Sequence, residues 1–386
     1  MKNYNKLITF LILFGTFLNL QSQNKYSDRK INNIKNQVSQ LVEEDKKLTT
    51  KKDSKGKPVK YITFVDAPGH EMLMATMLSG AAIMDAAILV VAADEGIKPQ
   101  TQEHLVALGA KRIKNIIIAQ NKIDLVTKEE AKANYDKIKE FVKGTVAENS
   151  PIIPISAEQE INLDIILQEL IKFTPKQKEE SEKPLFVIAR SFDINRPGVE
   201  VKKIHGGILG GALKKGKLKI GDEIEIKPGY SYKKQNKFYY KTVKSKIISM
   251  QKGEHQITEA TPGGSLAIET QLDPAITKTD ALSGGVLSLK DTLPEITETL
   301  KMKFCLFDKV LGTEKHEAVE MLKPSESLML SINTTISVGV VKSLNKNKDE
   351  VELALKIPIV PLKGESVGIA RNLNGHWRLI GFGEIV

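Results

Sequence analysis

Apolar and polar residues alternate in two kinds of block along the first half of the chain. Short runs rich in β-branched and aliphatic residues have the length of buried strands, and longer stretches between them have the periodicity of amphipathic helices. The strand-like runs are Val59–Val65, Ala86–Ala93, Asn115–Ala119 and Pro151–Ile155, and the helix-like stretches are Thr101–Ala110, Lys128–Val142 and Asn162–Phe173. This alternation predicts an α/β fold, in which helices cover both faces of a parallel sheet.

The pattern changes after residue 173. Thr174–Pro184 is charged, contains prolines at both ends and lacks apolar periodicity, so we interpret it as a linker between domains. Beyond it, short alternating runs are interrupted by glycines, and Leu218–Ile226 is typical of two strands joined by a turn. This half predicts an all-β barrel, and a second barrel is expected from near Thr297 to Val386.

The N-terminal segment does not fit the alternation. Lys2 and Lys6 precede the apolar run Leu7–Leu20, which is typical of a signal peptide and short for a membrane span. A misplaced start, a gene rearrangement and an ordinary buried strand are the alternatives. The polar stretch that follows predicts a short helix at 31–44, and a hairpin that pairs Lys47–Lys52 with Val59–Val65.

The net charge indicates which partners the chain favours, and the cysteine count excludes two kinds of site. The chain has 386 residues and a net charge of +10, which favours anionic partners such as nucleic acid, although a lysine-rich genome would produce the same balance. Cys305 is the only cysteine in the sequence. A disulfide framework and a cysteine zinc site within the chain are therefore excluded.

Polar residues follow three of the predicted strands. The first strand ends in Asp66, with Gly69 and His70 just beyond it; Asn121-Lys122-Ile123-Asp124 follows the third, and Ser156-Ala157 follows the fourth. A strand-end Asp is suited to act through a Mg²⁺ ion on bound phosphates, and a glycine three residues later lets a loop present its N–H to a γ-phosphate. Three such motifs in this order predict a GTPase.

These motifs and their surroundings resemble translational GTPases of the elongation factor Tu type. They are most similar to the gamma subunit of archaeal and eukaryotic translation initiation factor 2. The stretches that carry the resemblance are Phe64–Ala81, Gln120–Val126, Arg190–Gly198 and Gly206–Gly211. The resemblance implies a GTPase domain with two β-barrels, bound GTP or GDP with Mg²⁺, methionylated initiator tRNA, alpha and beta partner subunits, delivery to the small ribosomal subunit, and a cytoplasmic location.

The resemblance also assigns a role to each motif residue. Asp66 would hold Mg²⁺ through water, Gly69 would contact the γ-phosphate, and His70 would orient the attacking water as the catalytic residue. Asp124 would accept two hydrogen bonds from guanine, with Asn121 and Lys122 completing the pocket. Ser156 and Ala157 would contribute main-chain contacts to the guanine oxygen.

The sequence departs from the family in one respect. A phosphate-binding loop, Gly-x-x-x-x-Gly-Lys-Ser/Thr, is expected before Asp66 and does not occur in the chain. We therefore expect an atypical segment at 1–46, an incomplete GTPase domain at 47–174, a linker at 175–184, and barrels at 185–294 and 295–386. GTP hydrolysis by this chain remains a hypothesis.

Three functional alternatives follow from the missing loop. A separate chain from a split gene could supply it to a working GTPase. The chain could instead be a nucleotide-binding-deficient module that still holds tRNA or partner subunits, or an exported protein on the same scaffold. Two groups of lysines, at positions 214, 215, 217 and 219 and at positions 233, 234 and 237, are either contacts for tRNA phosphates or solvated loop residues.

Overall fold

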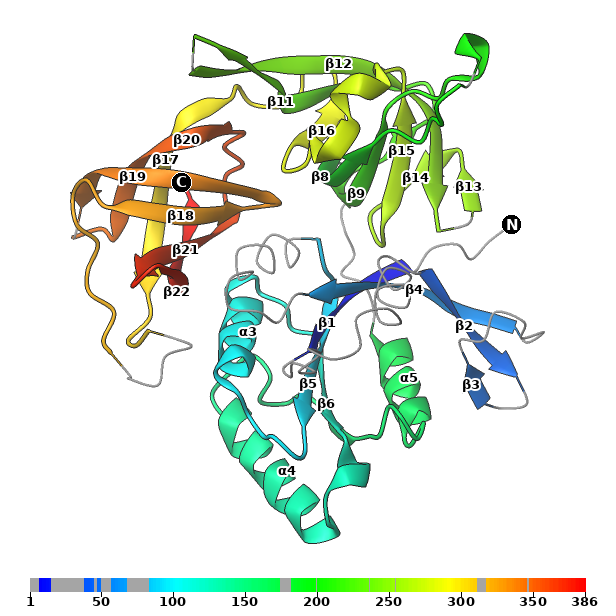
Figure 1. The fold of residues 1–386 in the computed structure, drawn as a ribbon, viewed down its shortest axis with the longest axis vertical. Helices are drawn as coiled ribbons and strands as arrows, with labels where there is room; N and C mark the ends of the chain where they lie inside the picture. Colours follow the sequence, from blue (N-terminus) through cyan, green and yellow to red (C-terminus); the bar gives the residue numbers. More distant parts are fainter. Residues whose placement is uncertain are drawn as a thin grey trace. The chain divides into compact units, whose positions relative to one another are not determined.

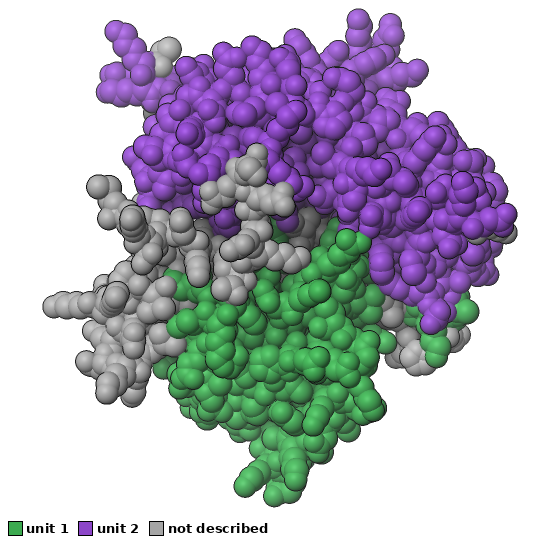
Figure 2. Space-filling model, turned by 180° about the vertical axis from the view of Figure 1, so that it is seen from behind, with its two compact units in different colours: residues 1–176, 309–318, 375–379 green, residues 177–308, 319–374, 380–386 purple. Residues whose placement is uncertain are grey.

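The computed structural model divides the chain into two compact units. It describes residues 7–14, 38–44, 47–49, 57–67, 83–173, 182–198, 200–235, 237–253, 255–310, 317–345 and 347–386. Unit 1 contains residues 1–176, 309–318 and 375–379, and unit 2 contains the remainder of the chain (Figure 2). No helix among the described residues has both the length and the apolar character needed to span a bilayer.

Unit 1 is built on a seven-stranded sheet in the order β3-β2-β4-β1-β5-β6-β7 (Figure 1). Its strands are β1 (Leu7–Phe14), β2 (Val38–Glu44), β3 (Lys47–Thr49), β4 (Lys57–Ala67), β5 (Ala86–Ala92), β6 (Ile116–Asn121) and β7 (Ile152–Pro154). The run from β4 to β7 is parallel throughout, whereas β2 is antiparallel to β4. The carboxyl ends of the five parallel strands therefore share one edge of the sheet.

Helices cover both faces of this sheet. The helices α3 (Pro99–Ala110) and α4 (Lys128–Val142) lie on one side, and α5 (Leu163–Lys172) lies on the other (Figure 1). Every residue of β5 is buried, as expected for a strand between two helical layers. A capping box formed by Thr127 and Glu130 fixes the start of α4.

The apolar N-terminal segment forms a strand in the middle of the sheet. Leu7–Phe14 is hydrogen-bonded to β4 on one side and to β5 on the other, with Ile12 opposite Asp66. The described part of this segment, residues 7–14, is therefore a strand of the sheet. Its registers with β4 and β5 are continuous, so β1 joins these two strands into one sheet.

Two local predictions next to this segment are wrong. Val38–Glu44, expected within a helix, is strand β2, because it is hydrogen-bonded along β4 and a long-range partner outweighs local helix propensity. The expected hairpin partner of β4 pairs differently as well: Lys47–Thr49 forms β3 against β2 rather than against β4.

The first barrel of unit 2 is a seven-stranded antiparallel sheet in the order β11-β16-β8-β9-β15-β12-β13, closed by pairing of β11 with β12. Its strands are β8 (Leu185–Phe192), β9 (Ile208–Lys215), β11 (Glu223–Lys234), β12 (Lys237–Lys252), β13 (His255–Ile257), β15 (Leu266–Thr270) and β16 (Val286–Leu289). Strands β10 (Leu218–Lys219) and β14 (Glu259–Ala260) pair separately. Gly211 lies so close to β8 that a Cβ there would be 2.0 Å from the Val187 carbonyl oxygen, so this crossing requires glycine.

The second barrel is closed by six strands in the order β17-β20-β19-β18-β21-β22. These are β17 (Thr297–Leu306), β18 (Ser327–Ile332), β19 (Thr335–Asn345), β20 (Glu350–Ile359), β21 (Ser366–Leu373) and β22 (His376–Ile385). Short 3₁₀ helices occupy Ile123–Leu125, Val201–Lys203, Pro274–Ile276 and Lys278–Asp280. The predicted fold class, an α/β domain followed by two β-barrels, is confirmed.

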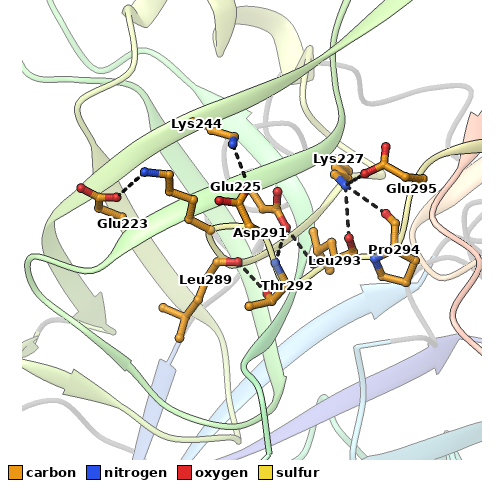
Figure 3. Close-up of polar contacts among 11 residues, drawn as sticks. Glu223, Glu225, Lys227, Lys244, Leu289, Asp291, Thr292, Leu293, Pro294 and Glu295 are labelled. Carbon is orange, nitrogen blue, oxygen red and sulfur yellow. Dashed lines mark hydrogen bonds and ion pairs between the residues drawn. The ribbon is translucent and has the colours of Figure 1, made fainter.

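Two buried charged residues of β11 fix the segment between the two barrels (Figure 3). The Glu225 carboxylate, 1% exposed, accepts hydrogen bonds from the backbone N–H groups of Thr292 and Leu293 at 2.9 and 2.7 Å. The Lys227 ammonium donates to the carbonyl oxygens of Leu293 and Pro294, both at 3.2 Å, and to Glu295 at 3.0 Å. Strand β11 thus holds the chain in place as it leaves the first barrel.

Candidate nucleotide-binding site

The candidate site residues that the structure describes lie at the edge of the sheet where the parallel strands end. Asn121 is the last residue of β6, and Ser156 stands two residues beyond the end of β7. Asp66 is the penultimate residue of β4, and the structure gives its position in the strand alone. Gly69 and His70 lie outside the described residues. Neighbouring parallel strands bring the loops after β6 and β7 together.

A side-chain hydrogen bond joins the loops after β6 and β7. The Asn121 side-chain oxygen accepts from the backbone N–H of Ala157 at 3.0 Å. The backbone strengthens the connection, because Ile123 N–H donates to the Ile155 carbonyl oxygen at 3.3 Å. Asn121 and Ala157, each expected to contact guanine, are therefore hydrogen-bonded to each other. The Ala157 N–H already has an acceptor in this structure.

Lys122 has an unusual backbone conformation and two acidic partners. Its φ of 64° is left-handed, which turns the chain sharply out of β6 into the 3₁₀ helix Ile123–Leu125. The ammonium contacts Glu95 at 2.9 Å and Asp94 at 3.3 Å, both in the loop after β5. The hydrogen bond to Glu95 raises the pKa of Lys122 above its usual range. These acidic partners were not predicted, because nothing local to Asn121–Asp124 indicates them.

Asp124 is the exposed acid of this loop. It lies in the 3₁₀ helix after β6, and none of the hydrogen bonds or ion pairs among the described residues involves its carboxylate. A carboxylate fixed by a short helix and open to solvent is available to accept hydrogen bonds from a ligand that presents two adjacent N–H donors.

Ser156 has a structural role in the loop after β7. It is fully buried, and its hydroxyl oxygen accepts from the Gln159 N–H at 3.1 Å. Its backbone pairs in both directions with Ile161, at 2.9 and 3.3 Å. The loop is thereby closed into a tight turn that presents Ala157 on the side of Asn121.

A buried amide that was not predicted, Gln120, fixes the end of β6. Gln120, 1% exposed, donates from its side-chain nitrogen to the Ala131 carbonyl oxygen and to the Asn134 side chain, both at 2.8 Å. These bonds join the end of β6 to α4.

Among the residues that the structure describes, no group of three or more His, Cys, Asp or Glu side chains could hold a metal ion.

Comparison with known families gives two matches along the chain. Residues 19–176 match the elongation factor Tu GTP-binding domain, and residues 298–385 match the C-terminal domain of initiation factor eIF2 gamma. The GTP-binding family model therefore covers the candidate site described above.

Similar proteins extend the match over most of the chain. The translation initiation factor 2 subunit gamma of Methanocaldococcus jannaschii is 49% identical over 329 residues, which cover 85% of this chain and 80% of that protein. The subunit from Pyrococcus furiosus is 48% identical over the same length and coverage. Translation elongation factor SelB of Methanococcus maripaludis, solved with a GTP analogue, shares the fold with a TM-score of 0.72 at 23% identity, over 98% of this chain and 79% of that one. The chain belongs to the family of translation initiation factor 2 gamma subunits.

Proposed function

We propose that this chain recognises guanine nucleotides through the loops after β6 and β7. We further propose that it carries methionylated initiator tRNA to the small ribosomal subunit as the gamma subunit of a heterotrimer with alpha and beta subunits, in the cytoplasm. The observation that carries the proposal is the bond between the Asn121 side chain and Ala157 N–H at 3.0 Å, beside an exposed Asp124. Asn121, Asp124 and Ala157 are thus three elements of a base pocket, contributed by the ends of β6 and β7 and the loops that follow them.

The chemistry of Asp124 accounts for selectivity between guanine and adenine. Guanine presents a ring N–H and an exocyclic amine side by side, and a carboxylate accepts both hydrogen bonds at once. Adenine lacks this pair of donors, so its binding would desolvate the carboxylate without compensation. Lys122 would lay its alkyl stem along the base while its ammonium stays with Asp94 and Glu95.

The phosphate side of the site would be formed by residues at and after the end of β4. Mg²⁺ would be held through water by Asp66, Gly69 would contact the γ-phosphate and His70 would orient the attacking water. The sequence has no Gly-x-x-x-x-Gly-Lys-Ser/Thr loop to surround the phosphates with backbone N–H groups. Losing three charge-assisted contacts of about 1.5 kcal/mol each weakens binding by about three decades. We therefore expect the isolated chain to bind GTP weakly and to hydrolyse it slowly.

The missing loop also supports a second candidate function. In this alternative the chain holds initiator tRNA or partner subunits without using nucleotide. The two candidates differ in whether tRNA binding responds to the nucleotide that is present.

The experiment is a filter-binding titration of methionylated initiator tRNA with the chain and its alpha and beta subunits. It is run with a non-hydrolysable GTP analogue, with GDP and without nucleotide. Tighter binding with the GTP analogue than with GDP supports the proposal. Equal binding in all three conditions supports the nucleotide-independent module. No binding in any of them contradicts tRNA delivery and leaves, of the alternative, only the holding of partner subunits.

A further inference from the structure

A two-stranded ribbon extends from the first barrel beyond the rest of its sheet (Figure 1). Strands β11 and β12 pair with each other as far as Lys234 and Lys237. Their outer neighbours stop earlier: β16 pairs with β11 only through Lys227, and β15 pairs with β12 only from Ile247 onward. No described strand is hydrogen-bonded to the outer edges of the part from Tyr230 to Lys241, which we name the distal ribbon.

A bulge separates the distal ribbon from the barrel. The register shifts between Ile226 and Tyr230, where Gly229 has a φ of 88°. A Cβ at this glycine would lie 2.1 Å from the Lys241 carbonyl oxygen, so the crossing requires glycine. Bulges bend and twist a strand pair, which directs the ribbon away from the sheet that it leaves.

The composition of the distal ribbon is basic and aromatic. Residues 230–241 contain four lysines, four tyrosines, one phenylalanine and no acidic residue. Half of the eight tyrosines of the chain are in these positions. A two-stranded ribbon has no core to bury such side chains, and Phe238, Tyr232 and Tyr239 are 60%, 43% and 42% exposed. Exposed aromatic groups that cluster on a protruding element indicate a binding surface.

The strand register divides these groups between the two faces of the ribbon: Lys233, Phe238 and Tyr240 lie on one face, and the remaining lysines and tyrosines lie on the other. Residues directly opposite one another in an antiparallel pair share a face. The second of these faces carries three successive rows: Tyr230 with Lys241, Tyr232 with Tyr239, and Lys234 with Lys237. The rings of Tyr232 and Tyr239 are stacked, with centroids 5.7 Å apart and planes inclined by 21°. A stacked aromatic pair therefore lies between two rows that carry ammonium groups.

The lysines of the distal ribbon differ from the other basic loop of this barrel. Lys215, Lys217 and Lys219 are paired with acids of the barrel, at 2.9 Å to Glu182 and at 3.2 and 3.3 Å to Glu259. Among the described residues, no ion pair involves Lys233, Lys234, Lys237 or Lys241. Of the two lysine groups distinguished in the sequence, the one in the ribbon is open to an anionic ligand.

The base of the ribbon is anchored. Glu225, just before the bulge, and Lys227, within it, bind the segment between the barrels, and Lys244 of β12 pairs with Asp291 at 2.8 Å (Figure 3). The ribbon is therefore supported at one end by the buried Glu225 and Lys227, while no ion pair between described residues involves Lys234 or Lys237 at its tip.

We propose that the distal ribbon binds single-stranded RNA, with unpaired bases stacked on the Tyr232–Tyr239 pair and phosphates contacted by Lys234, Lys237 and Lys241. The charge complementarity of an acid-free lysine cluster selects a polyanion, and the exposed rings select a polyanion with unstacked bases. Double-stranded RNA hides its base faces and would use only the lysines. The inference does not depend on the guanine site, which lies in unit 1.

The test is fluorescence anisotropy of the full chain with a labelled oligouridine RNA of about 12 nucleotides. Y232A/Y239A is expected to weaken binding by about 10- to 100-fold, whereas Y232F/Y239F keeps the rings and retains binding. K234A/K237A is expected to reduce the slope of log affinity against log salt by about 1.4, because two phosphate contacts are lost. The matched control K132A/K139A, on the exposed face of α4, is expected to leave both quantities unchanged.

Two further measurements localise the effect. Ultraviolet crosslinking followed by peptide mapping is expected to place the RNA within residues 230–241. Binding of a fluorescent GDP is expected to be unchanged in all the ribbon variants, so that failure of the guanine site and failure of the ribbon are distinguishable. Wild-type RNA affinity in Y232A/Y239A would overturn the proposal. Tighter binding of an RNA duplex than of the single strand would also overturn it. So would a result in which the ribbon variants weaken binding to phosphatidylserine vesicles but not binding to RNA.

Discussion

The Asn121 side-chain oxygen and the Ala157 N–H are joined by a hydrogen bond of 3.0 Å that spans 36 residues of sequence. It connects two loops that are otherwise joined by the backbone hydrogen bond from Ile123 N–H to the Ile155 carbonyl oxygen. Asn121→Ala removes the acceptor and frees the loop after β7. Loss of one such bond is expected to weaken guanine nucleotide binding by about 10-fold.

This prediction is measured by fluorescent GDP titration. Asn149→Ala, an exposed asparagine before β7, serves as the control and is expected to match wild type. An equal effect of the two substitutions would show that the connection between the loops does not contribute to the pocket.

Lys60 provides a test of how α5 is held on the sheet. Its ammonium donates to the carbonyl oxygens of Leu170, Ile171 and Phe173 at 3.1, 2.6 and 2.6 Å, at the C-terminal end of that helix. A cation in this position satisfies carbonyl groups that the helix leaves unpaired. Lys60→Met is expected to destabilise α5 by about 2–4 kcal/mol, measured by hydrogen exchange of its amides.

The control for this prediction is Lys172→Met. That ammonium lies on the surface of α5 and pairs only with Glu169 in the described part of the chain, so its loss is expected to cost less than about 1 kcal/mol. Similar exchange rates in the two variants would mean that the buried contacts of Lys60 do not hold the helix.

His104 predicts acid sensitivity of unit 1. It is 1% exposed in α3, its Nδ1 has no hydrogen-bond partner in the described structure, and burial lowers its pKa to about 4. Because the folded-state pKa lies below the unfolded value, the unfolded chain binds the extra proton. Stability is therefore full above about pH 6.5 and declines as the pH falls toward about 4.

The expected loss between pH 7.5 and pH 5 is about 2 kcal/mol from this residue. Urea unfolding of wild type and His104→Gln at both pH values measures it. The variant is expected to be less stable at neutral pH and to lose this part of the pH dependence. An unchanged pH dependence would show that His104 is not the group responsible.

Glu225 and Glu223 are two positions apart on β11 but have different environments. Glu225 is buried and accepts two backbone hydrogen bonds, whereas Glu223 is exposed and pairs with Lys290 at 2.8 Å. Glu225→Ala leaves the half-buried N–H groups of Thr292 and Leu293 without an acceptor. A cost of about 2 kcal/mol corresponds to exchange about 30-fold faster at Thr292 and Leu293.

Glu223→Ala is the matched control, and it is expected to leave the exchange of these amides within about twofold of wild type because surface ion pairs contribute little. Equal acceleration in both variants would contradict the role given to the buried carboxylate in fixing the segment between the barrels.

Much of the fold could be predicted from local sequence patterns. The helix α4 was predicted with its observed bounds, Lys128–Val142, because its charges and apolar residues keep a regular helical spacing. The strand β5 was predicted from its uninterrupted apolar run. The errors at β2 and β3 arose where the partner strand decides the structure, and a local pattern does not contain the partner.

The candidate site shows the same division. Asn121, Lys122 and Asp124 were identified because they are adjacent in the sequence and follow a strand. The contact of Lys122 with Asp94 and Glu95 joins two strands nearly 30 residues apart and depends on their parallel pairing. The buried role of Ser156 was likewise not predictable, since a serine after a strand has no local feature that distinguishes a buried hydroxyl from an exposed one.

The most direct test of the central claim is a calorimetric comparison of GDP and ADP binding to the full chain, with Asp124→Asn as the variant. GDP and ADP carry the same phosphates, so the comparison isolates the base. The wild-type chain is expected to prefer GDP by about 100-fold or more, because two charge-assisted hydrogen bonds depend on the base. Asparagine accepts from one guanine donor but opposes the other with its own amide, and it complements the oxygen that xanthine has there. The variant is therefore expected to lose GDP binding and to gain xanthosine diphosphate binding. Equal affinity for GDP and ADP, or undiminished GDP binding in Asp124→Asn, would contradict the account.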